Sequence, residues 1–374
     1  MVVSGEFGSQ GVSKICSSMG GWSVLPYDLL VEIAKRLIFE DFVAFSAVCS
    51  WWRSSAKKMA FFNPYNPPLL MYFEDQPPTK IVKYYSFSTC KTYKIPLTKF
   101  NPHRVFLSLP WLIIVEQDFH SIFFFNPLNG IQIELPSISN PRILSEPRRF
   151  LASIDKFVLS ACPSKTSDYI LASIHRYPFG LSFWRPGQTP WNNAKFMMET
   201  DNDIASVIFH KGHFYGLDKG GKFFKVLLDM NDMGIKLRVL SVNKEKCKLT
   251  HIEDLYLVES AGALLIVSRR ASWKPDKICE FRVYEVNIVD GKWTRMMSLG
   301  GSAIFVGGKS NCFSVHALDY PECKPNCIYF INGTTSSGAI RDEDNTVCLY
   351  NLQDRRTEIV DYWICSSYWV QPTF

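Results

Sequence analysis

The chain has 374 residues, of which 47% are hydrophobic, 14% aromatic and 20% charged. This length can hold a small module joined to a large one, and the composition excludes a largely disordered chain, while the aromatic share favours strands over helices. The net charge of +6 comes from 41 basic and 35 acidic residues spread along the whole chain, which excludes the concentrated basic footprint of a nucleic-acid-binding protein.

The first segment, residues 1–21, is rich in glycine and serine and has no hydrophobic periodicity, so we predict a flexible tail. It also lacks the continuous apolar core of a signal peptide. No apolar run in the chain approaches the roughly 18 residues that span a bilayer. We therefore expect a protein of the cytoplasm, the nucleus or both, without a membrane partner.

Residues 22–60 carry a helical pattern. Pro26 suits the first turn of a helix, a second short helix is predicted from Asp41, and a third from Val48 to about Met59. The apolar residues that recur at helical spacing in the first helix are Leu29, Leu30, Ile33 and Leu37. Those of the second helix are Phe42, Val43 and Phe45. The spacing therefore predicts a small module of three helices.

The pattern changes after this module. Residues 61–68, "FFNPYNPP", are predicted as a linker because proline does not fit a helix interior. Residues 69–374 consist of short aromatic or β-branched runs, separated by turn sequences such as "NPLNG", "DKGG" and "VDGK". No helical pattern interrupts these runs, so the larger part of the chain is predicted to be built of strands.

These strands arrive in roughly six groups, and small four-stranded sheets repeated around a ring make a β-propeller. The groups run from "LLMYF" to "YKIPL", "WLIIV" to "IELP", "FVLSA" to "FWRP", "VIFHKGHFYGLD" to "KLRVL", "LYLVES" to "KWTRMM" and "AIFVGG" to "EIVDYW". We therefore predict a mainly β protein, with a three-helix module followed by a propeller of about six blades. The late apolar stretch "YWICSSYWV" is expected to pair with the first blade and close the ring.

A Leu-Pro pair, a helical apolar stripe and the ending "VCSWWR" stand together in the helical module, which in these features resembles an F-box. The matching positions are Leu25, Pro26, Leu29, Leu30, Ile33, Leu37, Phe42, Phe45, Val48, Cys49, Trp52 and Arg53. Trp51 departs from the pattern, because many members of that family have a small or basic residue there.

The F-box resemblance implies a partner, since in that family the module docks through an apolar, proline-containing surface on a Skp-family adaptor, which joins a cullin-based ubiquitin ligase. The residues that the resemblance assigns to adaptor binding are Leu25, Pro26, Leu29, Leu30, Ile33, Leu37, Phe42, Val48, Cys49 and Trp52. A module this small also leaves apolar surface uncovered. We expect its apolar stripe to serve the partner and not the propeller.

A second resemblance covers about residues 68–365. The stretches "LNGIQIELP", "FHKGHFYGLDKGGKFFKV", "YLVESAGALLIVSRR", "FRVYEVN", "KWTRMMSLGGSAIFVGG" and "NCIYFIN" follow one another in the order seen in plant F-box proteins with a KIB-type domain. The resemblance implies that the predicted propeller, residues 69–374, is a domain of this type.

One segment, "CFSVHALDYPECKPNC", offers Cys312, His316, Cys323 and Cys327 as zinc ligands. Their spacing matches no familiar zinc motif, and alternate residues of a strand point apart. The 11 cysteines are odd in number and lie mostly in apolar runs, which indicates reduced, buried thiols. We predict no metal and no cofactor, and neither a nucleophile elbow nor paired carboxylates indicate catalytic residues.

The sequence leaves more than one class of function open. The first hypothesis is a substrate-receptor subunit of an SCF-type ubiquitin ligase, not itself an enzyme, whose helical module binds the adaptor and whose propeller recruits an unknown protein substrate. The default place for that recruitment is the loops at one end of the central channel. The alternatives are a propeller that binds a small molecule or a sugar, and a scaffold that has lost ligase assembly.

Overall fold

A computed structural model of the chain describes residues 21–37, 39–58, 68–76, 79–87, 89–97, 99–100, 102–109, 111–118, 121–127, 130–136, 153–176, 179–188, 191–194, 203–231, 234–241, 253–271, 279–307, 312–332, 346–362 and 367–370. The predicted tail and linker lie outside these residues, apart from Gly21 and Pro68.

Three α-helices and one 3-10 helix form the amino-terminal module, which confirms the helical prediction. The elements are η1 (Gly21–Val24), α2 (Tyr27–Ala34), α3 (Phe39–Ala47) and α4 (Ser50–Lys58). Pro26 lies just outside α2, and its carbonyl accepts hydrogen bonds from the backbone N–H groups of Leu29 and Leu30, both at 3.1 Å. The first α-helix of the module thus begins directly after the Leu-Pro pair, as the sequence indicates.

The strands of the first three blades form four-stranded antiparallel sheets. Blade one contains β25 (Ser367–Val370), β1 (Leu69–Gln76), β2 (Thr79–Ser86) and β3 (Lys91–Pro96). Blade two contains β4 (Pro102–Ser108), β5 (Trp111–Glu116), β6 (Ile122–Phe125) and β7 (Gln132–Leu135). Blade three contains β8 (Ile154–Leu159), β9 (Leu171–Arg176), β10 (Phe179–Trp184) and β11 (Asn192–Ala194).

The remaining blades complete the predicted count of six sheets. Blade four contains β12 (Ile204–His210), β13 (His213–Asp218), β14 (Phe223–Asn231) and β15 (Gly234–Ser241). Blade five contains β16 (Glu253–Ser260), β17 (Ala263–Ala271), β18 (Cys279–Val286) and β19 (Trp293–Met296). Blade six contains β20 (Ser302–Val306), β21 (Phe313–His316), β22 (Cys327–Asn332), β23 (Thr346–Asn351) and β24 (Arg356–Tyr362), with η2 (Ala317–Asp319) after β21.

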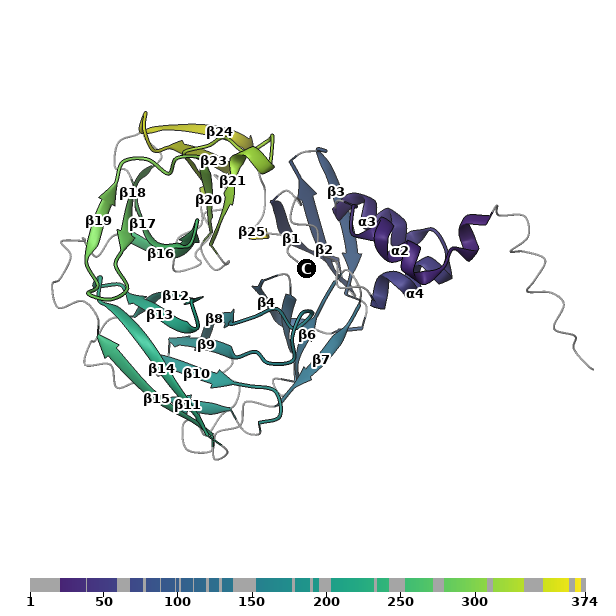
Figure 1. Ribbon diagram of the computed structural model, residues 1–374, viewed down its shortest axis with the longest axis horizontal. Coiled ribbons are helices and arrows are strands. Elements are labelled where there is room, and N and C mark those ends of the chain that lie inside the picture. The colour runs from purple at the N-terminus through teal and green to yellow at the C-terminus, as the bar shows by residue number, and fades with distance from the viewer. Residues whose placement is uncertain are drawn as a thin grey trace, which may run out of the picture.

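The six sheets stand around a ring (Figure 1), which confirms the propeller prediction. Neighbouring blades are held together by shared apolar clusters: one cluster joins blades two and three, and others join three with four, four with five, five with six, and six with one. Burial of these faces is the main favourable contribution to such a ring, because each small sheet alone leaves both of its faces in water.

The ring is closed by the late strand β25, as expected from its apolar sequence. β25 pairs antiparallel with β1, so that Trp369 lies opposite Leu70 and Val370 opposite Leu69. The strand from the end of the propeller thereby completes the first blade and covers the edge that β1 would otherwise expose.

Blade six departs from the regular pattern. β20 pairs with β22 in parallel, whereas β21 turns back and pairs antiparallel with the other edge of β20. The sheet therefore has five strands in the order β21, β20, β22, β23, β24, and β24 is its outermost strand.

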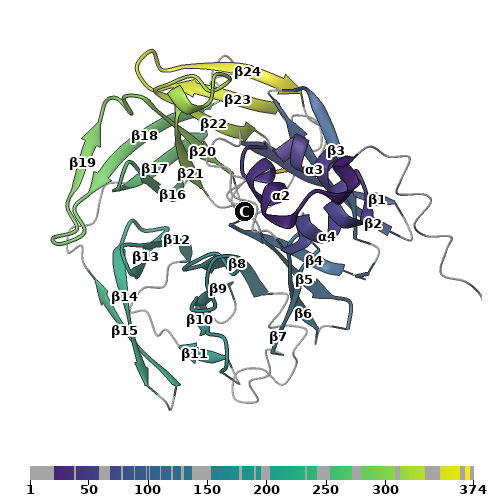
Figure 2. The ribbon, with the colours of Figure 1, turned by 45° about the vertical axis from the view of Figure 1, so that its right-hand side comes forward.

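The helical module shares a core with the propeller. Leu30, Phe42 and Phe45 are 0%, 1% and 3% exposed and belong to the same apolar cluster as Leu69 and Met71 of β1. Figures 1 and 2 both place the helices beside the first blade. The expectation that the apolar stripe serves only a partner is therefore wrong for Leu30 and Phe42, because the inward residues of the helices pack into the core that they share with the propeller.

Candidate functional site

A group of apolar side chains at the amino-terminal module remains in contact with solvent. We call this group the amino-terminal apolar face. Its members and their exposed fractions are Trp22 69%, Val24 70%, Tyr27 36%, Leu29 51%, Val48 51% and Trp51 41%. Scattered single apolar residues are ordinary on a surface, but so many within one small module are typical of a protein-binding surface.

Two tryptophans of α4 form hydrogen bonds to the segment that precedes α2. The indole N–H of Trp51 donates to the carbonyl of Leu25 at 2.9 Å, and that of Trp52 donates to the carbonyl of Trp22 at 2.9 Å. These bonds join the start of α4 to η1 and to the Leu-Pro pair, although the residues are far apart in sequence. Trp51, the departure from the F-box pattern, therefore has a structural role as well as an exposed ring.

Trp52 also ties the face to the core beneath it. Its ring lies 4.6 Å from the ring of Phe45, measured between centroids, and Phe45 in turn stacks on Phe42 at 6.1 Å. Aromatic pairs at these separations add to the stabilisation that burial supplies. The exposed residues of the face therefore lie on helices that are packed on an aromatic core.

The residues assigned to adaptor binding fall into three groups by exposure. Pro26, Leu29 and Val48 are exposed. Five others are half-buried: Leu25, Ile33, Leu37, Cys49 and Trp52. Leu30 and Phe42 are in the core, so in this arrangement they support the face without being able to touch a partner.

Sequence reasoning did not include four members of the face: Trp22, Val24, Tyr27 and Trp51. The first two lie in η1, ahead of the predicted helix, where no periodicity marks them. The available signal was Trp22 itself, which follows a glycine-rich segment. A large apolar ring in such a stretch has no neighbouring apolar residues to pack against, which indicates an exposed position.

The centre of the propeller holds a separate cavity of about 360 Å³. It is lined by residues of the innermost strands and their turns in blades two to six, among them Leu109, Lys156, Phe209, Glu259, Cys312 and Ser314. Burial lowers the pKa of Lys156 and raises that of the Cys312 thiol. The channel beside which recognition was expected is therefore hollow, and its walls combine apolar side chains with polar ones that include Lys156 and Glu259.

The residues considered as zinc ligands differ in their surroundings. Cys323 and Cys327 are buried, Cys312 is half-buried at the central cavity, and His316 is exposed on β21. Among the described residues, no group of three or more His, Cys, Asp and Glu side chains is placed to hold a metal ion. Every cysteine in that part of the chain is a free thiol.

Two family models match the chain. The model described as the KIB1-4 beta-propeller matches residues 84–351, and that of the F-box domain matches residues 22–63. The chain belongs to the KIB1-4 beta-propeller family. This KIB1-4 protein carries its F-box domain directly ahead of the propeller, which confirms both resemblances.

Relatives of this KIB1-4 protein are F-box proteins of a plant. An F-box/kelch-repeat protein of Arabidopsis thaliana is 24% identical over 84% of this chain and 81% of its own length. An F-box protein of the same plant is 31% identical over 45% of this chain and 45% of its own length. Among solved structures, the chain is similar to an uncharacterized protein of Listeria monocytogenes with a TM-score of 0.37 and 7% identity, over 83% of this chain and 84% of that one.

No helix within the described residues is both long and apolar enough to cross a bilayer.

Proposed function

We propose that this chain is a substrate-receptor subunit of an SCF-type ubiquitin ligase. Its F-box binds a Skp-family adaptor, which joins a cullin, and its propeller recruits a protein substrate. The observation that carries the proposal is the amino-terminal apolar face, which lies on the F-box and is supported by a core shared with the propeller. F-box proteins are typically non-catalytic subunits, which agrees with this role.

The mechanism follows from proximity. A receptor that holds a substrate beside a ubiquitin-charged enzyme raises the effective concentration of the reacting groups, and needs no catalytic residue of its own. The shared core matters here, because an F-box fixed to the propeller restricts where a bound substrate can lie relative to the adaptor. A freely jointed F-box would lose part of that gain.

The test replaces Leu29 and Val48 together by aspartate. Both side chains are 51% exposed, so the change places charge on the binding surface without entering the core. We expect the wild-type protein to co-purify with a Skp-family adaptor and a cullin, and the double variant to lose at least about tenfold in adaptor affinity. Leu30 is unsuitable for this purpose, because charge at a fully buried position would unfold the module.

The matched control replaces Val289 and Leu318 by aspartate, since both are aliphatic residues, 86% exposed, outside the F-box. This control should keep adaptor binding, and both double variants should keep the melting temperature of the wild type. Equal adaptor binding by the Leu29 and Val48 variant would contradict the proposal. An absence of adaptor binding by the wild type would favour a scaffold or a ligand-binding propeller instead.

A further inference from the structure

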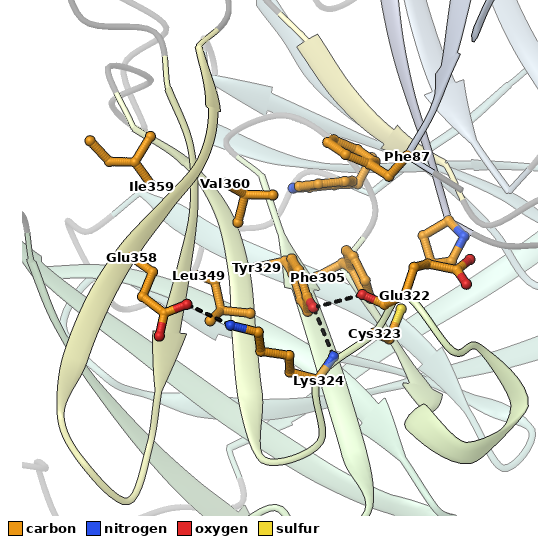
Figure 3. A pocket seen from close by; sticks show the side chains of 12 residues that line it. Phe87, Phe305, Glu322, Cys323, Lys324, Tyr329, Leu349, Glu358, Ile359 and Val360 are labelled. Atoms are coloured by element: carbon orange, nitrogen blue, oxygen red, sulfur yellow. Dashed lines mark hydrogen bonds and ion pairs between the residues drawn. The ribbon is translucent and has the colours of Figure 1, made fainter. Parts of the chain in front are cut away.

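A second cavity, of about 240 Å³, lies between blade six and blade one (Figure 3). Blade six contributes Phe305, Tyr329 and Leu349 to its lining, and blade one contributes Phe87 and Trp369. We call this cavity the closure pocket, because it lies where the ring-closing strand β25 meets the last sheet. It is distinct from the central cavity, with which it shares no lining residue.

The floor of the closure pocket is formed by aromatic side chains that contact one another. The rings of Phe305 and Tyr329 are stacked at 4.6 Å with 8° between their planes, and Trp369 meets Phe305 edge-on at 5.0 Å. All three side chains are less than a tenth exposed. Phe305 also stacks on Phe313 at 5.1 Å with 14° between their planes, so another ring would meet this group of aromatic side chains mainly at its edges.

The rim of the pocket is polar. Lys324 and Glu358 extend toward each other across one side of the pocket, with 2.6 Å between Nζ and Oε2 (Figure 3). The Tyr329 hydroxyl accepts the backbone N–H of Lys324 at 2.9 Å and donates to the carbonyl of Glu322 at 3.4 Å. An apolar floor beneath a few placed polar groups is the usual composition of a binding site.

The outermost strand of blade six, β24, forms one wall of the pocket. Ile359 and Val360 line the cavity and are 46% and 44% exposed. Asp361 pairs with Val347 and Ile359 with Cys348, so Val360 is the extra residue of a β-bulge. The bulge gives β24 two neighbouring apolar residues at the mouth of the pocket, beside a strand edge that no other strand of the described residues pairs with.

The volume of the pocket limits the size of the group that it can hold. Cavities of about 150 Å³ hold benzene, and sites for drug-sized molecules span about 300–1,000 Å³. A space of 240 Å³ therefore suits a single ring system and its first attachments. An extended peptide that adds to a sheet edge supplies such groups one at a time, because alternate side chains point to one face.

We propose that the closure pocket receives one aromatic side chain of an extended peptide segment, which pairs with the outer edge of β24. Arg355 and Arg356 are exposed at the start of β24, beside Asp354 and shortly before Glu358, whose carboxylate is paired with Lys324, so the peptide should carry acidic residues at that end. The peptide is taken to belong to the ubiquitylation substrate, and in that respect alone the proposal rests on the proposed function.

The experiment selects peptides from a phage-displayed library of random linear sequences on the immobilised full-length protein. We expect the enriched sequences to share one Trp, Tyr or Phe, with acidic residues to one side. A selected peptide should slow hydrogen exchange of the amides in residues 356–362, because pairing covers that edge, and leave β19, the outer strand of blade five, unchanged.

Val360→Glu places a charge at the mouth and should weaken the selected peptide by at least about tenfold. Ile359→Glu provides a second variant, and Val289→Glu, on a turn in blade five, is the matched control that should bind as the wild type does. Circular dichroism and melting temperature check that each variant is folded.

Three results would overturn the proposal: enriched sequences without a shared aromatic residue, undiminished binding to both pocket variants, or binding of free N-acetyltryptophanamide as tight as that of the peptide. The last would show that pairing with β24 contributes nothing. Adaptor co-purification is measured separately on the same variants. Loss of peptide binding with adaptor binding retained separates this site from the F-box, and a failure of adaptor binding leaves the peptide result intact.

Discussion

His175 of β9 is a titratable residue enclosed within blade three. Its Nε2 atom lies 2.9 Å from the Ser173 hydroxyl and 2.9 Å from the Ser182 hydroxyl, on the neighbouring strand β10. Burial lowers the pKa of this imidazole to about 3, so the ring is neutral at physiological pH. A neutral ring can exchange hydrogen bonds with two hydroxyls at no cost in buried charge.

This pKa predicts an acid sensitivity. The unfolded imidazole titrates near pH 6.5, so the unfolded chain binds more protons between about pH 3 and 6.5, and stability falls as the pH drops through that window. His175→Asn should remove this contribution. Between about pH 6.5 and 5, the wild type should lose about 2 kcal/mol more than the variant, measured by urea unfolding. Parallel losses in both proteins would contradict the assignment to His175.

Two neighbouring leucines show how far the sequence could predict the exposed residues of the F-box. Leu29 and Leu30 are adjacent and chemically identical, yet one is 51% exposed and the other 0%. Periodicity places both on an apolar stripe, but which edge of the stripe faces outward depends on the apolar cluster of helix and strand residues in which Leu30 is buried. The F-box could therefore be predicted as a partner site, whereas its exposed residues could not be separated from its core.

At the scale of elements, short sequence motifs predicted the turns correctly, because a turn depends on neighbouring residues. The turns "NPLNG", "DKGG" and "VDGK" join β6 to β7, β13 to β14 and β18 to β19, as their composition indicates. β4, by contrast, was absent from the predicted groups. Its Arg104 donates to the carbonyl of Ile154 in blade three at 2.8 Å, a contact that no sequence window contains. The closure pocket was likewise unpredictable, because residues from both ends of the propeller sequence form it.

The closing strand β25 yields a stability prediction. Trp369 is 1% exposed and packs on Phe305 and Phe87 with ring centroids 5.0 and 5.7 Å away. Trp369→Ala should cost about 3–5 kcal/mol in the free energy of unfolding, since it leaves a cavity and weakens ring closure. Trp22→Ala, at a ring that is 69% exposed, is the control and should change far less. Similar urea midpoints for both variants would argue against closure by this residue.

At the scale of the whole molecule, the F-box and the propeller are not independent bodies joined by a linker. The cluster that contains Leu30 and Phe42 extends into blades one and two, where it includes Leu69 of β1 and Leu112 of β5. The F-box thus has apolar residues that pack into this shared cluster and other apolar residues that are exposed to solvent.

This arrangement predicts that the propeller depends on its F-box. The chain shortened to residues 68–374 should melt at a lower temperature than the full chain and expose apolar surface to a dye such as ANS, because the helices no longer cover blade one. The Leu29 and Val48 double aspartate variant is the comparison, since it alters only the outer side of the F-box. An equal melting temperature for the shortened chain would mean that the shared core adds no stability.

The pairing of β25 with β1 also bears on how the protein is made. Translation produces the first blade with one strand missing, and that strand leaves the ribosome only after every other blade has been synthesised. Until then β1 has an unpaired edge and the closure pocket lacks Trp369. Because contacts between such distant residues form slowly, the nascent chain passes through a long period in which chaperones or neighbouring chains can reach that edge. Growth conditions that slow translation should therefore lower the yield of folded protein and leave unchanged the free energy of unfolding of the molecules that do fold.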